Sequence, residues 1–271
     1  MIYKKSLSIP FVIWIIAGTI IPIFAIAYYG LTDRTGAFTL ENVFAMADKN
    51  HLQALGLSIL LALISTFVCF LIAYPLSLIL RSSRFGKRGL MIFLFILPMW
   101  MNFLLRTMAW QVLLEKNGVI NGFLGMLGLP NQEIINTPAA IVLGMVYDFL
   151  PFMILPIFNV ISKIDNQVIE AAYDLGASHK NVLLKIYLPL SIPGIVSGVT
   201  MVFVPSLTTF VISNILGGGK IHLIGNIIEQ EFTVSSNWNL GAGLSLIMMI
   251  FIVISMIFME KFDKTGEDSF I

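Results

Sequence analysis

The chain has 271 residues, of which 58% are hydrophobic and only 11% are charged. A soluble domain carries roughly 25–35% charged residues on its surface, so this composition excludes an ordinary soluble protein. The 16 basic and 15 acidic residues give a net charge of +1, which gives no reason to expect a nucleic-acid partner. The charges are also clustered, and the uncharged runs between them are long enough for the roughly 20 residues that cross a bilayer core. We therefore predict an all-α integral membrane protein.

The apolar runs predict six transmembrane helices in a single transmembrane domain that covers residues 1–271. The predicted spans are 9–29, 55–80, 89–112, 138–161, 191–214 and 241–259. Helices are expected because backbone groups without hydrogen bonds are not tolerated in lipid, and these runs lack the alternation of a membrane strand. The Gly-rich segment 117–132 is too short to span, so we interpret it as an outer interfacial or re-entrant hairpin.

The distribution of basic residues predicts the orientation. An even number of spans places both termini on one side, and the excess of Lys and Arg belongs on the cytoplasmic side. With cytoplasmic termini, the inside would hold eleven basic residues and the outside only Arg34, Lys49, Lys116 and Lys220. Ala25-Ile26-Ala27 could also mark a signal-peptide cleavage site, but the apolar stretch before it is longer than the usual 7–15 residues. We therefore expect the first segment to be retained as a span.

The segment between spans four and five, residues 162–190, predicts two short helices joined by a tight turn. Asp165 is a good N-cap for the first helix, and Gly176 can adopt the left-handed conformation that ends it. Ser178 caps a second helix, which we expect Pro189 to stop near the membrane. Such an amphipathic pair can lie on lipid or present its apolar face to a protein partner.

Within this segment stand Glu170-Ala171-Ala172, then Gly176, then Ile186-x-Leu188-Pro189, in the spacing E-A-A-x3-G-x9-I-x-L-P. The segment resembles the EAA loop of permease subunits in ATP-binding-cassette importers. Residues 97–121, 147–158 and 216–232 resemble the spermidine/putrescine permeases of that family, so the similarity covers about 60–260.

The resemblance implies a type I importer permease fold and a cytoplasmic loop that docks on an ATPase subunit. The coupling residues it implies are Glu170, Ala171, Ala172, Gly176, Ile186, Leu188 and Pro189. It also implies a place in the bacterial inner membrane and a set of partners. These partners are a second, unlike permease subunit, two ATPase subunits and an extracellular or periplasmic polyamine-binding protein.

No motif predicts a catalytic, nucleotide or metal site in the chain itself. Gly217-Gly218-Gly219-Lys220 is followed by Ile221, whereas a phosphate-binding loop needs Ser or Thr there. The three histidines are isolated in sequence, and Cys69 is the single cysteine, so no zinc-ligand spacing exists. We therefore expect no cofactor and no metal, and any ATP would be bound by another chain.

Ionisable residues within spans are the default candidates for a transport pathway. Asp148 lies inside span four, where it could meet an alkylammonium group with Tyr147 or Trp110 as a cation–π face. It could instead pair with Arg106 or with a backbone dipole. Glu229 and Glu231 could contact the binding protein or line the outer mouth, or could be solvated loop charges.

The proposed activity at this stage is ATP-driven polyamine uptake by alternating access. Three alternatives remain open: an importer of another solute, an ion-coupled carrier that uses Asp148, and a membrane scaffold. A carrier would work without an ATPase and often contains internal repeats, of which the sequence has no sign. The sequence does not distinguish spermidine from putrescine as the preferred substrate.

Overall fold

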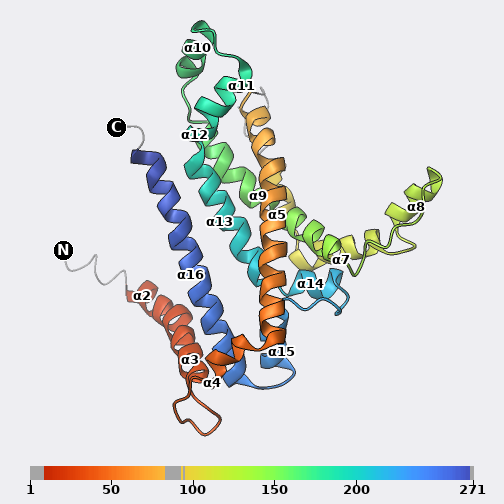
Figure 1. Ribbon diagram of the computed structural model, residues 1–271, viewed down its shortest axis with the longest axis vertical. Helices are drawn as coiled ribbons and strands as arrows, with labels where there is room; N and C mark the ends of the chain where they lie inside the picture. The colour runs from red at the N-terminus through yellow and green to blue at the C-terminus, as the bar shows by residue number, and fades with distance from the viewer. Residues whose placement is uncertain (1–8, 83–92, 94, 269–271) are drawn as a thin grey trace. The chain divides into compact units, whose positions relative to one another are not determined.

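The computed structural model describes residues 9–82, 93 and 95–268, and the side chains of 10–82, 93 and 95–261. Within this part of the chain the regular structure is helical, apart from one isolated bridge between Thr32 and Phe38. The α-helices (Figure 1) are α2 (Ile9–Ile15), α3 (Ile21–Gly30), α4 (Glu41–Phe44), α5 (Lys49–Ser82), α7 (Phe103–Leu114), α8 (Val119–Met126), α9 (Pro138–Ile161), α10 (Asn166–Asp174), α11 (His179–Val182), α12 (Leu188–Leu190), α13 (Ile192–Thr208), α14 (Val211–Leu216), α15 (Ile224–Thr233) and α16 (Trp238–Asp268).

The chain divides into two compact units, which we describe separately. Unit 1 consists of Met1–Leu55 and Asn226–Val253, and unit 2 consists of Gly56–Gly225 and Ile254–Ile271. The single transmembrane domain over 1–271 stays a prediction.

In unit 1, the turn that follows α3 is tied to the start of α16. The Asn239 side chain donates hydrogen bonds to the carbonyl oxygens of Thr32 at 2.7 Å and Tyr29 at 3.1 Å. Asn42 donates to the same Thr32 oxygen at 2.9 Å. A Cβ atom at Gly243 would lie 2.6 Å from the Cβ of Asn42. Only glycine at position 243 therefore allows α16 to pack this closely against Asn42. These amide side chains satisfy carbonyl groups that a turn leaves without helical partners.

In unit 2, α9 and α13 pack along each other and form the centre of the apolar core. Gly194 and Gly198 lie one turn apart on α13, where a Cβ would come within 2.8 Å of the Pro156 oxygen and 2.7 Å of the Met153 sulfur. Small residues at this spacing let two helix backbones approach closely, which is the usual way helices pack in membranes. The pair α9 and α13 therefore forms a tightly packed frame for the loop that connects them.

Four described helices are long and apolar enough to cross a membrane: Pro10–Gly30, Lys49–Ser82, Pro138–Ile161 and Trp238–Lys261. A fifth crossing results if His179–Leu190 and Ile192–Thr208, which meet at an angle of 65°, form one bent span. These helices contain the expected spans 55–80, 138–161 and 241–259 and all but the first residue of 9–29, and α9 coincides with the fourth expected span.

The other two expected spans differ from the structure. For 89–112, residues 89–92 and 94 lie outside the described part, and the rest is not one helix. A short 3-10 turn over Leu97–Trp100 is followed by extended Met101 and Asn102, and the Asn102 side chain caps α7. For 191–214, extended Thr209 separates α13 from α14. In both cases the helix is interrupted at a polar residue: Asn102 caps the following helix, and Thr209 adopts extended backbone. Hydropathy does not detect such local interruptions.

The segment predicted as a hairpin, 117–132, contains α8 followed by a return stretch. The buried side chain of Asn121 joins α8 to the return stretch. Its amide donates to the Gln132 backbone oxygen at 2.9 Å and accepts from the Gln132 N–H at 2.8 Å. The opposite face of α8 is exposed and apolar, with Phe123 and Met126 the most prominent side chains. Its position at a membrane interface stays a prediction.

Candidate functional site

The segment 162–190, for which the sequence predicts a coupling role and which is called the coupling loop here, folds as two short helices around a glycine turn. The Asp165 carboxylate caps α10 by accepting the Gln167 N–H at 3.0 Å, and the Ser178 hydroxyl caps α11 by accepting the Asn181 N–H at 3.3 Å. Across the turn, the Tyr173 hydroxyl and the Nδ1 of His179 are 2.9 Å apart and their rings meet edge to face. The helix pair and its caps thus agree with the pattern in the sequence.

The spacing E-A-A-x3-G has a direct structural reason at the end of α10. Gly176 adopts φ of +80°, a conformation that costs a residue with a side chain about 1–2 kcal/mol. Its N–H donates to the Tyr173 oxygen at 2.8 Å, and the N–H of Ala177 donates to the Ala172 oxygen at 3.0 Å. These two bonds form a Schellman motif, which satisfies the last carbonyls of a helix. Among the described residues, no atom beyond the chain neighbours of Gly176 would lie within 4 Å of a Cβ at this position, so the requirement for glycine is conformational.

α10 presents an apolar stripe to solvent. The stripe consists of Val168, Ala171, Ala172 and Leu175, at the i, i+3, i+4, i+7 spacing of one helix face. Val168 is 48% exposed and Leu175 is 90% exposed, whereas Ile169, which lies outside the stripe, is buried. Glu170 is also exposed, but it lies on the other side of α10 from the stripe. An apolar row of this kind on a loop rich in charged residues is typical of a protein-docking surface.

The second half of the coupling loop packs inward. Leu183, Tyr187 and Leu188 contact the apolar core of unit 2, and Ile186 and Pro189 are half-buried. The expectation that Pro189 stops the helix is wrong, because helical backbone continues to Leu190 and the sharp bend comes at Ser191. A π-helical turn over Leu183–Tyr187 precedes the proline. Its wider hydrogen-bonding pattern removes the regular carbonyl ladder with which a proline ring clashes.

A buried ion pair lies between α7 and α9. The Nη2 of Arg106 is 3.3 Å from the Oδ1 of Asp148, and the two side chains are 7% and 1% exposed. The Thr107 hydroxyl donates to the other carboxylate oxygen at 3.2 Å. The structure therefore has the pairing that was one of the alternatives for Asp148. Two guanidinium nitrogens of Arg106, Nε and Nη1, are buried and have no hydrogen-bond partner among the described residues.

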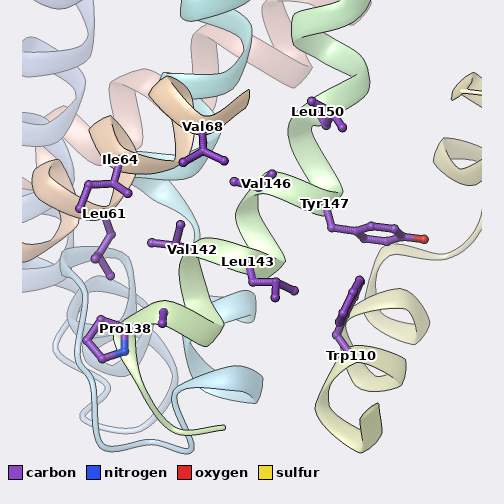
Figure 2. A pocket seen from close by; sticks show the side chains of 11 residues that line it. Leu61, Ile64, Val68, Trp110, Pro138, Val142, Leu143, Val146, Tyr147 and Leu150 are labelled. Atoms are coloured by element: carbon purple, nitrogen blue, oxygen red, sulfur yellow. The ribbon is translucent and has the colours of Figure 1, made fainter. Parts of the chain in front are cut away.

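Tyr147 and Trp110 stand beside the ion pair and form an aromatic corner. Their ring centroids are 5.3 Å apart and the rings meet edge to face, while the guanidinium carbon of Arg106 lies 6.0 Å from the centre of the Tyr147 ring. Figure 2 shows both rings at one side of an apolar pocket of about 650 Å³. The remaining wall comes from aliphatic side chains of α5 and α9, among them Leu61, Val68 and Val142. Aromatic faces thus border the pocket, and the carboxylate of Asp148 does not.

Glu229 and Glu231 lie on α15 in unit 1 and are described apart from the ion pair, which belongs to unit 2. The Thr233 hydroxyl donates to the Glu229 carboxylate at 3.1 Å, and the Ser235 hydroxyl donates to the Glu231 carboxylate at 3.4 Å. Both glutamates are half-buried. A contact of either residue with substrate or with a binding protein stays a prediction.

Sequence reasoning missed the polar contacts that hold the coupling loop. Arg81, at the end of α5, was counted only as one of the basic residues expected on the cytoplasmic side. In the structure it reaches Ile164, Asn166 and Tyr187, which flank the two ends of the loop. The available signal was an arginine at the end of an expected span, which does not reveal its partners. Among the residues that the structure describes, no three His, Cys, Asp or Glu side chains gather as metal ligands.

A family model described as "Binding-protein-dependent transport system inner membrane component" matches residues 73–265, which include the coupling loop and the ion pair. The chain belongs to this family. It is accordingly a multi-pass inner-membrane component of a transport system rather than an enzyme. The resemblance found in the E-A-A-x3-G segment is thus confirmed over most of the chain.

Individual relatives and solved structures agree with this membership. The chain is 36% identical to the spermidine/putrescine transport system permease protein PotB of Haemophilus influenzae, over 86% of this chain and 84% of that protein. It is 37% identical to PotB of Escherichia coli K12, over 79% and 78%. A bacterial transporter that imports the acidic polysaccharide alginate superposes with a TM-score of 0.83 at 14% identity, over 97% of this chain and 95% of that chain. The fold is therefore that of a type I importer permease.

Proposed function

We propose that this chain is a permease subunit of an ATP-driven importer of polyamines such as spermidine and putrescine. Relatives at 36% and 37% identity carry that substrate in their names, and both are matched over more than three quarters of their length. A relative from Escherichia coli named only as an inner membrane ABC transporter permease, YdcU, is less similar, at 27% identity. The higher identity to the two spermidine/putrescine permeases than to YdcU favours a polyamine over another solute.

The exposed apolar stripe on α10 is the observation that carries the coupling mechanism. Leu175 is 90% exposed on a loop that is otherwise well capped and anchored. Burying a leucine of this kind contributes about 1.5–3 kcal/mol, so a protein that covers it gains affinity. We propose that a separate ATPase subunit covers the stripe, with Ala171 and Ala172 at the contact. Glu170, on the other side of α10, stays a predicted coupling residue. Gly176 holds the turn, and Ile186, Leu188 and Pro189 fix the loop to the membrane part.

The importer would contain four further chains. These are a second, unlike permease subunit, two ATPase subunits and a polyamine-binding protein on the outer side. Both termini of this chain would be cytoplasmic, since eleven basic residues then lie inside and four outside. Nucleotide-driven closure of the ATPases would move α10, and the membrane helices would repack to expose the path alternately to the two sides.

Substrate passage would depend on weak, replaceable contacts, because a conducting site must release what it captures. The aromatic corner of Tyr147 and Trp110 offers such contacts to an alkylammonium group, at about 0.5–2 kcal/mol for each cation–π interaction. Asp148 is paired with Arg106, so its charge is largely neutralised for a passing cation. Glu229 and Glu231 are the candidates for the outer mouth or for contact with the binding protein.

Uptake in intact cells tests the proposed function. Deletion of the gene should abolish ATP-dependent uptake of labelled spermidine, and expression of this chain should restore it. Unlabelled putrescine should compete, whereas an amino acid or an organic anion should not. Unchanged spermidine uptake in the deletion strain would refute the substrate. Purification of the chain without any ATPase subunit, in every nucleotide state, would refute the ATP-driven mechanism.

A further inference from the structure

The end of α5 holds the coupling loop at both of its ends through one arginine. The Nη2 of Arg81 donates to the carbonyl oxygen of Ile164 at 2.7 Å and to the side-chain oxygen of Asn166 at 2.8 Å, just before α10 and at its first residue. Its Nη1 donates to the hydroxyl of Tyr187, in the π-helical turn. The guanidinium carbon also lies 5.1 Å from the centre of the Tyr187 ring. A planar fork with several donors can make these contacts together, which a lysine cannot.

A second contact joins α5 to the bend between α12 and α13. The hydroxyls of Tyr74 and Ser191 are 3.1 Å apart, and both residues are buried. Ser191 is the residue at which the chain bends by 65°, and its hydroxyl also donates to the Leu188 oxygen at 3.0 Å. Tyr74 lies seven residues, or about two turns, before Arg81 on the same helix. Both residues therefore lie on the side of α5 that faces the coupling loop.

These contacts connect the loop to a helix that is remote in the sequence. The loop leaves α9 and enters α13, so those two helices receive any displacement of α10 through the backbone. The residues that Arg81 and Tyr74 contact are between 83 and 117 positions away in the chain. Hydrogen bonds to a charged group are about twice as strong as neutral ones, so the contacts of Arg81 can transmit force to α5.

We infer that, in the importer proposed above, α5 is a third element that carries the motion of the coupling loop into the membrane, and that Arg81 and Tyr74 are its positioning residues. Arg81 keeps the start of α10 and the π-helical turn at fixed distances from the end of α5. Tyr74 keeps the bend at Ser191 in register with them. When α10 moves with its ATPase, α5 moves with it, together with the pocket wall that α5 contributes.

The ratio of substrate imported to ATP hydrolysed measures this role in the reconstituted complete importer. Wild type must first show ATP-driven spermidine uptake, and its absence there would count against the proposed function rather than against α5. For Arg81→Gln, the ratio should fall at least about tenfold, because the loss of even one of its hydrogen bonds from a charged group has an effect of that size, while the ATPase stays bound and hydrolyses ATP. Arg81→Lys should restore only part of the ratio. Lys163→Gln removes an exposed positive charge from the same loop and should leave the ratio unchanged.

Milder variants decide the matter if Arg81→Gln prevents assembly. Tyr187→Phe and Tyr74→Phe each remove one hydroxyl and keep the ring, so the apolar packing stays in place. A lowered import ratio in either variant, with normal yield of the complex, would support the role of α5. Wild-type ratios in both variants, or in an assembled Arg81→Gln complex, would overturn it.

Discussion

The coupling loop and the buried ion pair both belong to unit 2, but they differ in how far their functional side chains are exposed and paired within the chain. In the ion pair, Asp148 is 2% exposed and is engaged by Arg106 and Thr107. In the coupling loop, Glu170 is exposed and Leu175 is 90% exposed, with the backbone around them fully capped. A buried side chain with partners inside the chain stabilises the fold. An exposed side chain on a well-capped loop is available to bind another molecule.

This difference changes the interpretation of the intramembrane charge. An ionisable residue within a span is a pathway candidate because a bare charge in lipid is costly, but an internal partner removes that cost as well as a substrate would. The aromatic corner beside the pair borders the pocket, while the carboxylate does not. The comparison therefore separates a structural ion pair from a docking stripe, and four substitutions test that separation.

The largest effect is expected from breaking the ion pair. Asp148→Ala leaves the Arg106 cation buried without its partner, which should lower the free energy of unfolding by about 3–5 kcal/mol. Thermal unfolding of the purified protein measures the loss. The double variant Arg106→Met/Asp148→Leu removes both charges and should be close to wild type in stability.

Spermidine uptake by that double variant then separates the two roles of Asp148. Retained uptake agrees with a structural pair. Lost uptake in a protein of normal stability would assign the carboxylate to the transport path, and an undiminished melting temperature in the single variant would contradict the importance of the pair.

A smaller effect is expected at the docking stripe. Leu175→Glu places a charge where we propose that the ATPase covers an apolar side chain, and loss of that burial should weaken the association by about 1.5–3 kcal/mol. The amount of ATPase that co-purifies with the chain measures this. Leu175→Met conserves the volume and should bind normally. Because Leu175 is exposed, neither change should alter the stability of the isolated chain, and equal recovery of the ATPase with both variants would argue against docking here.

Substitutions at Gly176 should have a smaller effect again, and the size of that effect should depend on the residue introduced. Gly176→Val forces a β-branched residue to φ of +80°, at a cost of about 1–2 kcal/mol, and should reduce ATP-driven uptake. Gly176→Asn should be much milder, because asparagine tolerates the left-handed region. The space around this position is open, so a steric reason would not distinguish the two. Equal uptake by the valine and asparagine variants would show that transport does not depend on the left-handed backbone conformation at position 176.

The smallest effect is expected at the aromatic corner. Trp110→Leu removes one cation–π face of about 0.5–2 kcal/mol, which should raise the KM for spermidine about two- to thirtyfold while kcat changes little. Trp100 is 78% exposed and lies away from the pocket lining, so Trp100→Leu is the matched control. An unchanged KM in Trp110→Leu, or the same rise in both variants, would remove the aromatic corner from the proposed path.

The sequence alone predicted the coupling loop in nearly all its local detail. Asp165, Gly176 and Ser178 act through backbone groups within a few residues, so their roles follow from the order of residues. Pro189 was the exception, because the π-helical turn before it let the helix continue. Hydropathy likewise identified the long helices, but it did not register the extended residues at Met101, Asn102 and Thr209.

Contacts between distant segments were decided only by the tertiary structure. The sequence contained Asp148 and Arg106 and allowed several partners for the carboxylate, and only the packing of α7 on α9 brought the pair to 3.3 Å. Arg81 counted as one basic residue among eleven until the fold placed it between the two ends of the coupling loop. Local structure follows from interactions a few residues apart, which the sequence specifies directly. Partners more than 80 residues away depend on how whole helices pack.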